Sequence, residues 1–536
     1  MFLLPGLVIA WYVTETPISD PVAIEMKNYL FARQHPEDGG WGLHIEGASS
    51  VFGTAMNYVS LRILGMSAED PRMIKARGLL HSMGGAKNGP HWLKWWLTVL
   101  NVAKWEIVNP VPPELWLLPD WVPFAPWRWW IHMRQVFLAM SFVASKGWQC
   151  KSTPLTLALR DELFVEDWDK LDWAAHRNSI HEKDNYHAKS TLLVILFWLI
   201  ANFLPYIRWI WRDRAEAWAW KLIEMEDKNT DYSDLAPVNG AMNLVACYIQ
   251  EGADSYSVKR HRERAMEFLW MKGEGMLVNG TNGLQSWDTA FSVQSVFDCG
   301  LAEEDRWRPM LTKALEFLDD QQIREDVNDQ DLCYRQQRKG AWAFSNKDQG
   351  YAVSDCVSEA LKSVLYLQRT PGYPKLLSDE RIFDAVDTLL TYQNASGGCA
   401  SYEPTRGSEY IEILNAAEVF GRIMIEYDYP ECTTAVVTAL SLFQKCYPGH
   451  RTEEIKAFKA RAVNYIKKAQ FADGSWYGSW GICFTYAAWF ALESLASIGE
   501  TYENSEHSRR GCEFLLSKQA ADGGWSESYL VSEEVI

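Results

Sequence analysis

A turn phrase recurs along the chain and constrains the fold more than any other feature of the sequence. Each copy begins with glutamine, passes through one or two glycines and ends, in three of four copies, in tryptophan. The glycines supply the positive φ that most L-residues avoid, so we expect a helix to end at the glutamine. The copies are QHPEDGGW at 34–41, QNASGGC at 393–399, QFADGSW at 470–476 and QAADGGW at 519–525.

Helical hydrophobic patterns lead into these phrases. Apolar residues recur three and four positions apart at 382–390 and at 455–466, whereas patterns of strict period two are sparse. The glutamine amide is suited to hydrogen-bond the ends of neighbouring helices, which would tie successive hairpins together. The sequence therefore predicts an all-α fold built from helical hairpins.

Aromatic content, charge and cysteine usage limit the function classes. The 536 residues include 27 Trp, 23 Tyr and 22 Phe, which predicts an aromatic-lined cavity, a membrane contact or both. The net charge of -17 argues against binding to nucleic acid, because phosphate recognition needs a basic surface. Ten scattered cysteines without a CxxC pair indicate reduced thiols in a cytosol-facing protein rather than a disulfide framework.

One segment is long and free of charge. Residues 190–207 read STLLVILFWLIANFLPYI, which is near the lower length limit of a membrane span, and Pro205 shortens the regular part. Three interpretations stay open: a transmembrane span, a buried helix, or a monotopic helix that dips into one leaflet. The residues that follow suit lipid headgroups, namely Arg208, Trp209, Trp211, Arg212 and Arg214.

Residues 351–362, YAVSDCVSEALK, carry the sharpest candidate for chemistry. Asp355 stands in an apolar setting ahead of a helix that carries Glu359. Burial would disfavour its charged form and raise its pKa, which makes it a candidate proton donor. From these residues alone, an aspartate that caps the helix is the alternative interpretation.

This phrase and the turn repeats together resemble the oxidosqualene cyclases, triterpene cyclases of the lanosterol-synthase type, in their fungal and animal members. The resemblance covers nearly the whole chain and implies two α/α barrels that enclose an apolar cavity. It places one barrel at 1–270, with a membrane-contacting helix near 190–211, and the acid-bearing barrel at 271–536. Four further phrases agree with it: GGWGLHIEG (39–47), FGTAMNYVSLRILG (52–65), GTNGLQSWDTAF (280–291) and GSWGICFTY (478–486).

The resemblance also implies an activity. We expect an isomerase that cyclises 2,3-oxidosqualene to a tetracyclic triterpenol of the lanosterol or protostane type, without metal or other cofactor. We further expect monotopic association with membrane lipids, on the cytosolic side of the endoplasmic reticulum or on lipid droplets. The oligomeric state stays open.

Family members extend further at both ends, which implies a chain truncated ahead of the first barrel and before the closing helices of the second. A catalytically inactive truncated cyclase is therefore an alternative. Another is a zinc-dependent prenyltransferase subunit, with Asp331 and Cys333 as ligands and either His450 or His507 as the histidine.

For the acid, the resemblance assigns four residues. The family's proton donor falls on Asp355, and the two thiols that hydrogen-bond it fall on Cys356 and Cys432. The carboxylate that reprotonates the donor falls on Glu359.

For the cation that the acid creates, the resemblance assigns aromatic rings and a base. A migrating carbocation needs π-faces that stabilise positive charge without a nucleophile that would capture it. The candidate final base falls on His132, with Tyr402 near it. The rings fall on Trp92, Trp130, Trp287, Phe344 and Trp480.

Overall fold

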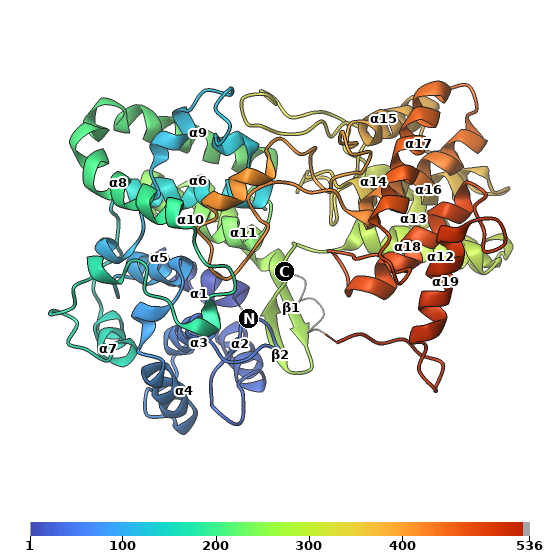
Figure 1. Cartoon of the computed structure of the whole chain (residues 1–536). Coiled ribbons are helices and arrows are strands. Elements are labelled where there is room, and N and C mark those ends of the chain that lie inside the picture. The colour runs from blue at the N-terminus through green and yellow to red at the C-terminus, as the bar shows by residue number, and fades with distance from the viewer. Residues whose placement is uncertain (1, 529–536) are drawn as a thin grey trace. The chain divides into compact units, whose positions relative to one another are not determined.

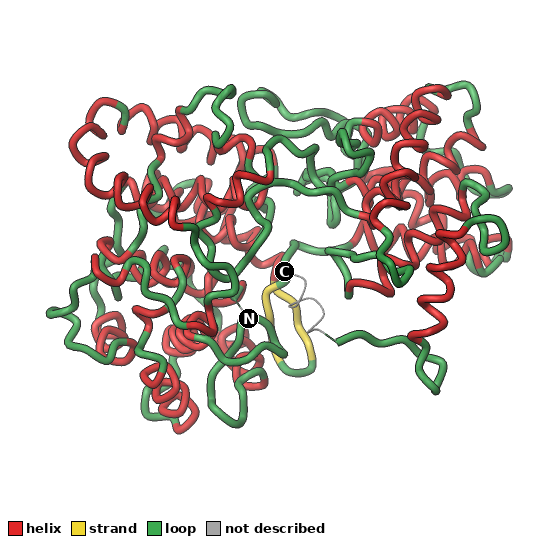
Figure 2. The backbone as a smooth tube through the Cα atoms, in the orientation of Figure 1, coloured by secondary structure: helices red, strands yellow, loops and turns green. Residues whose placement is uncertain are grey.

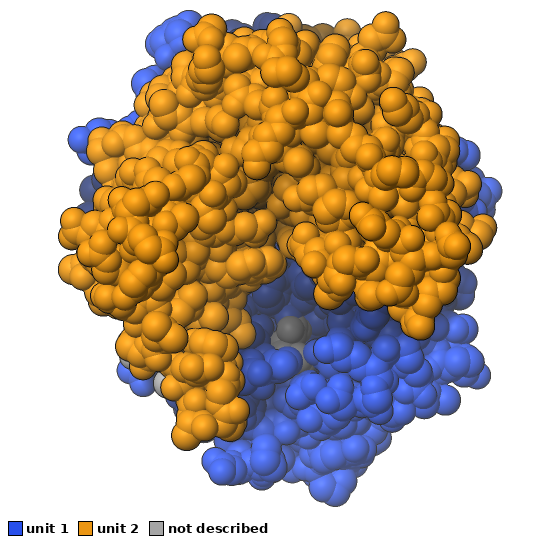
Figure 3. Space-filling view, turned by 90° about the vertical axis from the view of Figure 1, so that its right-hand side faces the viewer, with its two compact units in different colours: residues 1–282, 407–425 blue, residues 283–406, 426–536 orange. Residues whose placement is uncertain are grey.

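The computed structural model describes residues 2–528. Within this part of the chain, helices account for the regular structure apart from one short hairpin (Figures 1 and 2), which confirms the all-α prediction. The chain forms two compact units, coloured separately in Figure 3: residues 1–282 with 407–425, and residues 283–406 with 426–536. The boundary expected between 270 and 271 stays a prediction.

The first unit contains α1 (Leu3–Val13), α2 (Asp20–Ala32), α3 (Val51–Ile63), α4 (Pro71–Ser82), α5 (His91–Val99), α6 (Ile131–Ser145), α7 (Pro154–Leu163), α8 (Thr191–Ile207), α9 (Arg212–Asn229), α10 (Pro237–Glu251), α11 (Tyr256–Ala265), β1 (Leu269–Lys272) and β2 (Gly275–Val278). Helices α3, α1, α10 and α6 pack side by side as an inner layer, and α4, α9 and α11 cover it. Helix α1 is apolar on all sides and almost wholly buried, as an inner helix must be. Strands β1 and β2 pair antiparallel, and β2 packs on α2.

The second unit contains α12 (Gln285–Asp298), α13 (Arg308–Gln321), α14 (Ser354–Arg369), α15 (Asp379–Leu390), α16 (Pro430–Cys446), α17 (Thr452–Ala469), α18 (Cys483–Ser497) and α19 (Glu506–Lys518). Helices α12, α14, α16 and α18 form its inner layer in that order. Each outer helix packs on the inner helix that precedes it in the chain. Outer helix α15 buries one apolar face, as the pattern at 382–390 predicts. Two layers of alternating helices in each unit are the α/α arrangement that was expected.

The turn repeats join neighbouring outer helices of this arrangement. The Gln470 amide donates to Gly474 O in its own turn at 2.9 Å and to His507 O on the next outer helix at 3.0 Å. The Trp476 indole N–H donates to Ile466 O, on the helix that it follows, at 2.8 Å. The predicted tie between hairpins is therefore confirmed, and the same pair of amide bonds is made by Gln34 and Gln393.

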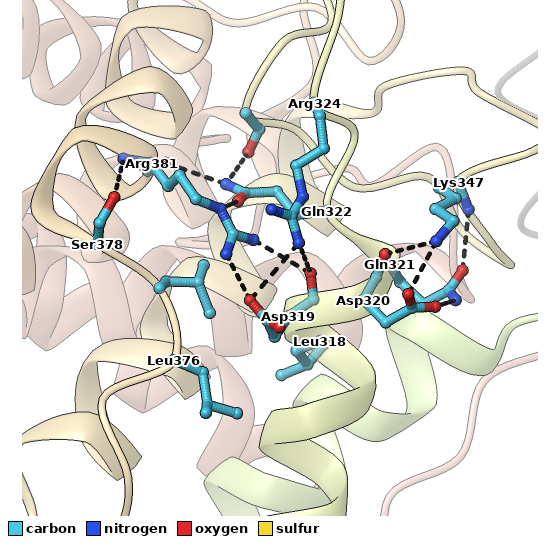
Figure 4. Close-up of polar contacts among 12 residues, drawn as sticks. Leu318, Asp319, Asp320, Gln321, Gln322, Arg324, Lys347, Leu376, Ser378 and Arg381 are labelled. Carbon is cyan, nitrogen blue, oxygen red and sulfur yellow. Dashed lines mark hydrogen bonds and ion pairs between the residues drawn. The ribbon is translucent and has the colours of Figure 1, made fainter.

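A further copy of this motif was missed in the sequence because a long insertion separates its two parts. The Gln322 amide donates to Gly340 O at 2.8 Å and to Arg381 O on α15 at 3.0 Å (Figure 4). Trp342 completes the copy by donating to Leu318 O at 2.8 Å. The hydrogen bonds of the motif are therefore kept although a long insertion separates Gln322 from Trp342.

Candidate active site

Asp355 lies in the first turn of α14, in the inner layer of the second unit, and is 5% exposed. The helix begins at Ser354 with Val353 as its N-cap, so the interpretation of Asp355 as a capping residue is wrong. Ser354 anchors this start, because its N–H donates to Ser401 O at 2.9 Å and its hydroxyl donates to Ala400 O at 2.6 Å. The carboxyl is therefore held at a fixed helix end and is free for another role.

The surroundings of Asp355 favour its protonated form. Burial raises its pKa to about 7, and the negative charges of Glu359 and Glu431 act in the same direction. The backbone N–H of Cys356 donates to Oδ1 at 2.9 Å and acts against this shift. An acid with a pKa near 7 holds a proton at neutral pH and can still release it, which is the match that general acid catalysis needs.

The two predicted thiol partners lie near this carboxyl. Cys356 and Cys432 are both buried, and burial beside Asp355 raises the pKa of each thiol well above its ordinary value. The side chains of Ser354 and Ser401 lie beside the Cys432 thiol and act against that shift. The hydrogen bond that the structure shows at this carboxyl comes from the backbone N–H of Cys356, which the first helical turn leaves without a helical partner. The hydrogen bonds from the two thiols to Asp355 stay a prediction.

Glu359 lies one helical turn after Asp355 and is fully buried. Its Oε2 accepts a hydrogen bond from Gln294 at 2.7 Å and forms an ion pair with Lys362 at 2.9 Å. Burial raises the pKa of Glu359, and the Lys362 ammonium acts against that shift. Residues four positions apart share one helix face, so the structure brings Glu359 to the same side as the acid. Its relay role stays a prediction.

Two of the predicted cation-facing rings meet in the second unit. The ring centroids of Trp287 and Phe344 are 5.6 Å apart. Phe291, which was not singled out from the sequence, extends this pair at 4.6 Å from Trp287 and reaches Trp489 at 6.1 Å. Phe291 stands one helical turn after Trp287, so helical spacing was the signal that could have found it.

Trp480 forms a separate aromatic pair in the same unit. Its ring lies 5.4 Å from that of Tyr429 and is 44% exposed. The buried Glu431 holds its backbone, since Oε1 accepts the Trp480 N–H at 2.8 Å. No local pattern indicates this contact, because Glu431 and Trp480 are far apart in the sequence.

Tyr402 also belongs to the second unit. Its ring makes an edge contact with Tyr351 at 6.3 Å, and burial raises its pKa well above the ordinary value, so the phenol is neutral. The charges of Cys356 and Asp355 contribute to that shift, which indicates that Tyr402 lies near the acid. Its cooperation with His132, a residue of the first unit, stays a prediction.

The first unit contains an apolar cavity of about 970 Å³. Trp92, Trp130 and His132 all line it, so three predicted site residues share one space. Phe420, which the sequence did not single out, lies 6.4 Å from Trp92 in the same wall. Residues of α8 and of the returning segment 407–425 complete the lining.

His132 is the basic candidate in this cavity. Its ring centroid lies 4.4 Å from that of Trp130. Burial lowers its pKa to about 4, so the imidazole is neutral at neutral pH. A neutral imidazole carries a nitrogen lone pair that can accept a proton.

A buried carboxylate holds the returning segment against the cavity. Glu418 is 1% exposed, accepts the His91 N–H at 3.0 Å and pairs with the Lys189 ammonium. Burial alone would raise the pKa of Glu418, but the Lys189 charge outweighs it and the pKa is lowered. These partners are far apart in the sequence, so no local pattern could have indicated the clamp.

Helix α8 has two apolar faces with different surroundings. Leu193 and Phe197 are buried and line the cavity, whereas Ile195, Trp198 and Phe203 are 50%, 59% and 56% exposed. The interpretation of residues 190–207 as a buried helix is therefore wrong. Residues 191–210 are long and apolar enough to cross a membrane by length and composition, and 11% of that segment is buried.

One group of side chains could hold a metal ion within residues 2–528: Asp227, Cys247 and His261 of the first unit. His261 Nε2 lies 3.3 Å from Asp227 Oδ2, and the Cys247 thiol donates to the same oxygen at 3.3 Å. Burial raises the pKa of Cys247 well above its ordinary value, which keeps the thiol neutral beside Asp227. These contacts suit a buried hydrogen-bond network. Asp331 and Cys333, the zinc ligands of the prenyltransferase alternative, are outside this group.

Comparisons with known proteins match both halves of the chain. Residues 8–272 match the squalene-hopene cyclase N-terminal domain, and residues 285–534 match the squalene-hopene cyclase C-terminal domain. A lanosterol synthase of Aspergillus fumigatus is 65% identical over 100% of this chain and 71% of its own length. Lanosterol synthases of Gibberella zeae and Homo sapiens are 62% and 43% identical, over 96% and 100% of this chain and 68% and 73% of their own lengths.

Proposed function

Because the chain belongs to the squalene-hopene cyclase family, we propose that it is an isomerase that cyclises 2,3-oxidosqualene to a tetracyclic triterpenol of the lanosterol or protostane type. The observation that carries the proposal is Asp355, a buried carboxyl at the start of an inner helix with a pKa of about 7. The names of the similar lanosterol synthases support the substrate and the product class.

In the proposed reaction Asp355 acts as the general acid. Its O–H protonates the epoxide oxygen, the C–O bond breaks, and the double bonds of the substrate close in turn onto the carbocation. The Asp355 carboxylate that remains is stabilised by the Cys356 N–H and by the positive end of the α14 dipole. The rings of Trp287 and Phe344 offer the cation about 0.5 to 2 kcal/mol each.

The cavity of the first unit supports the proposal from the substrate side. Its 970 Å³ lies at the upper end of the roughly 300 to 1,000 Å³ range of ligand pockets, which suits a thirty-carbon chain. His132 in its wall is neutral and is the proposed acceptor of the final proton. Trp92 and Trp130 supply π-faces there.

The test is conversion of the substrate by the purified chain in detergent. Incubation with 2,3-oxidosqualene, followed by gas chromatography and mass spectrometry, should give a tetracyclic alcohol of unchanged molecular formula. Squalene itself should not react, because it lacks the epoxide that an acid of this strength protonates. Failure to convert oxidosqualene would overturn the proposed activity.

The exposed face of α8 supports a second, finer part of the proposal, namely monotopic membrane association on the cytosolic side of the endoplasmic reticulum or on lipid droplets. Its outward side chains bury apolar area in one leaflet, and Trp209 at 77% exposure suits the headgroup region. The opposite face lines the cavity, so an apolar substrate would pass from lipid to cavity along one helix without crossing water.

Membrane fractionation tests this attachment. Replacement of Ile195, Trp198, Leu199 and Phe203 by Ser or Gln should release the protein into the soluble fraction, whereas high salt should not release the wild type. Trp270 and Met271 on β1 are similarly exposed apolar residues, and their replacement by Gln is the matched control. Retention of the α8 variant on the membrane would place the attachment elsewhere. Protease access to Lys189 and Arg214 from opposite sides would establish a span instead.

A further inference from the structure

Lys362 on α14 is a buried cation that joins a buried and an exposed carboxylate. Its Nζ lies 2.9 Å from Glu359 Oε2 and 3.7 Å from Glu493 Oε1 on α18. The side chains of Glu359, Lys362 and Glu493 are 0%, 4% and 44% exposed. The three groups therefore form a line of charges from the interior of the second unit to its surface.

The buried charges of this line do not add clear stability to the folded protein, so packing alone does not explain them. Burying an ion pair in an inner helix gives little net stability over apolar side chains of similar volume. Glu359 also leaves one oxygen, Oε1, buried without a hydrogen-bond partner among residues 2–528. Burial lowers the pKa of Lys362, but the charges of Glu359 and Glu493 outweigh it, and its pKa is raised. The ammonium thus keeps its protons at rest between two carboxylates.

Asp355 needs a supply of protons if it is the acid. Each protonation of an epoxide leaves a carboxylate that is 5% exposed and must be protonated again before the next cycle. Glu359 lies one turn away on the same helix face, and its Oε1 has no hydrogen-bond partner among residues 2–528. Lys362 and Glu493 add a connection from Glu359 to the water at the surface of the unit.

We propose that Lys362 and Glu493 form the outer part of a proton path that resupplies Asp355 through Glu359, an inference that rests on the proposed role of Asp355 as the acid. Glu493 takes a proton from water. Lys362 gives one proton to Glu359 and takes one from Glu493, and Glu359 passes its proton to the Asp355 carboxylate. Each relay group returns to its starting state, so that one proton moves from water to Asp355.

The direct test is the exchange rate of the Asp355 carboxyl proton, which needs no substrate. The protein is moved into heavy water at pH 6, and the carboxyl stretch is followed by infrared spectroscopy, with the Asp355→Asn spectrum subtracted. Lys362→Met should slow the exchange roughly tenfold or more, and Glu493→Gln should slow it less. Exchange at the wild-type rate in both variants would overturn the proposal.

Two further variants separate proton transfer from structural support. Lys362→Arg keeps the positive charge but cannot release a proton, so it should fold like the wild type and exchange as slowly as Lys362→Met. Exchange at the wild-type rate in Lys362→Arg would reduce Lys362 to a structural cation. Lys456→Met and Glu453→Gln remove an exposed ion pair of the same spacing on α17 and should leave the exchange unchanged.

Turnover kinetics supply a second readout. In the path variants the first turnover, which uses the proton already on Asp355, should keep its wild-type rate, while steady-state turnover falls with the exchange rate. An equal loss in both phases would count against the path. If wild-type protein converts no oxidosqualene, the proposed function fails, whereas the exchange measurement still decides whether the path exists.

Discussion

Asp355 in the second unit and His132 in the first are both buried titratable side chains, but burial moves their pKa values in opposite directions. It raises that of Asp355 to about 7 and lowers that of His132 to about 4. Burial disfavours the charged form of each, so the carboxyl keeps a proton and the imidazole lacks one. The same desolvation therefore prepares one group to donate and the other to accept.

The causes that shift the pKa values of the two groups differ. Asp355 has the Cys356 N–H and the negative charges of Glu359 and Glu431 beside it, which tune its pKa in both directions. His132 lines an apolar cavity, and burial is the cause that shifts its pKa. Single neighbours can therefore adjust the pKa of the acid, whereas burial sets the pKa of the base.

Asp355→Asn is the sharpest way to break the comparison on the acid side. The amide has nearly the same shape but no acidic proton, so turnover of oxidosqualene should fall about 10⁴-fold, at the upper end of what general acids contribute. Asp379→Asn replaces an exposed aspartate in the first turn of α15 and is the matched control. Near-normal turnover by Asp355→Asn, measured with a folded protein, would remove Asp355 from the role of acid.

His132→Gln breaks the comparison on the other side. Initiation is untouched, so the total rate should fall less, by up to roughly 10²-fold, and the products should shift toward prematurely deprotonated alcohols. Gas chromatography of the product mixture measures this. A slower reaction with an unchanged mixture would argue that His132 does not handle the final proton.

The pH profile of turnover tests both pKa values together. Asp355 must be protonated, so activity is present below pH 7 and falls about tenfold per unit well above it. His132 must be neutral, so activity falls as the pH drops through about 4. Glu359→Gln removes a negative charge that raises the Asp355 pKa, and the upper limb should move to lower pH. An upper limb that stays in place would contradict the coupling of the two carboxyls.

Cys432→Ala should have the smallest effect. Its thiol lies beside Ser354 and Ser401 near the start of α14, and in the predicted role it gives the Asp355 carboxylate a single hydrogen bond. Loss of such a bond corresponds to about 0.5 to 1.5 kcal/mol, or up to roughly a tenfold lower turnover, without a change in products. A loss as large as that of Asp355→Asn would contradict the role of a single supporting bond, and Cys399→Ala serves as a buried thiol control.

Features with local signatures were predictable from the sequence. The phrase at 470–476 predicted a helix end and a tie to the next hairpin, and Gln470 makes both bonds. The apolar setting of Asp355 predicted a raised pKa, which the structure confirms. The resemblance supplied Trp92, Trp130 and His132, and all three line one cavity.

Features that depend on distant segments were not predictable. The Gln322 copy escaped because its glutamine and tryptophan are separated by an inserted stretch, so no short phrase exists. The bond from the Cys356 N–H to Asp355 was not singled out, because it depends on where α14 begins. Sequence spacing fixes which residues share a helix face, but it does not decide between neighbouring donors for one carboxyl.

The clamp between Glu418 and the earlier residues His91 and Lys189 of the first unit has a consequence for biosynthesis. Residues 407–425 supply a wall of the cavity, yet the ribosome makes them only after residues 283–406 have emerged. The first unit therefore cannot complete its fold before residues 407–425 have been synthesised. Until then, the apolar residues of its cavity are exposed to solvent. A gene divided between codons 282 and 283 would separate this wall from its unit. The two coexpressed fragments would then have to associate before the cavity is complete.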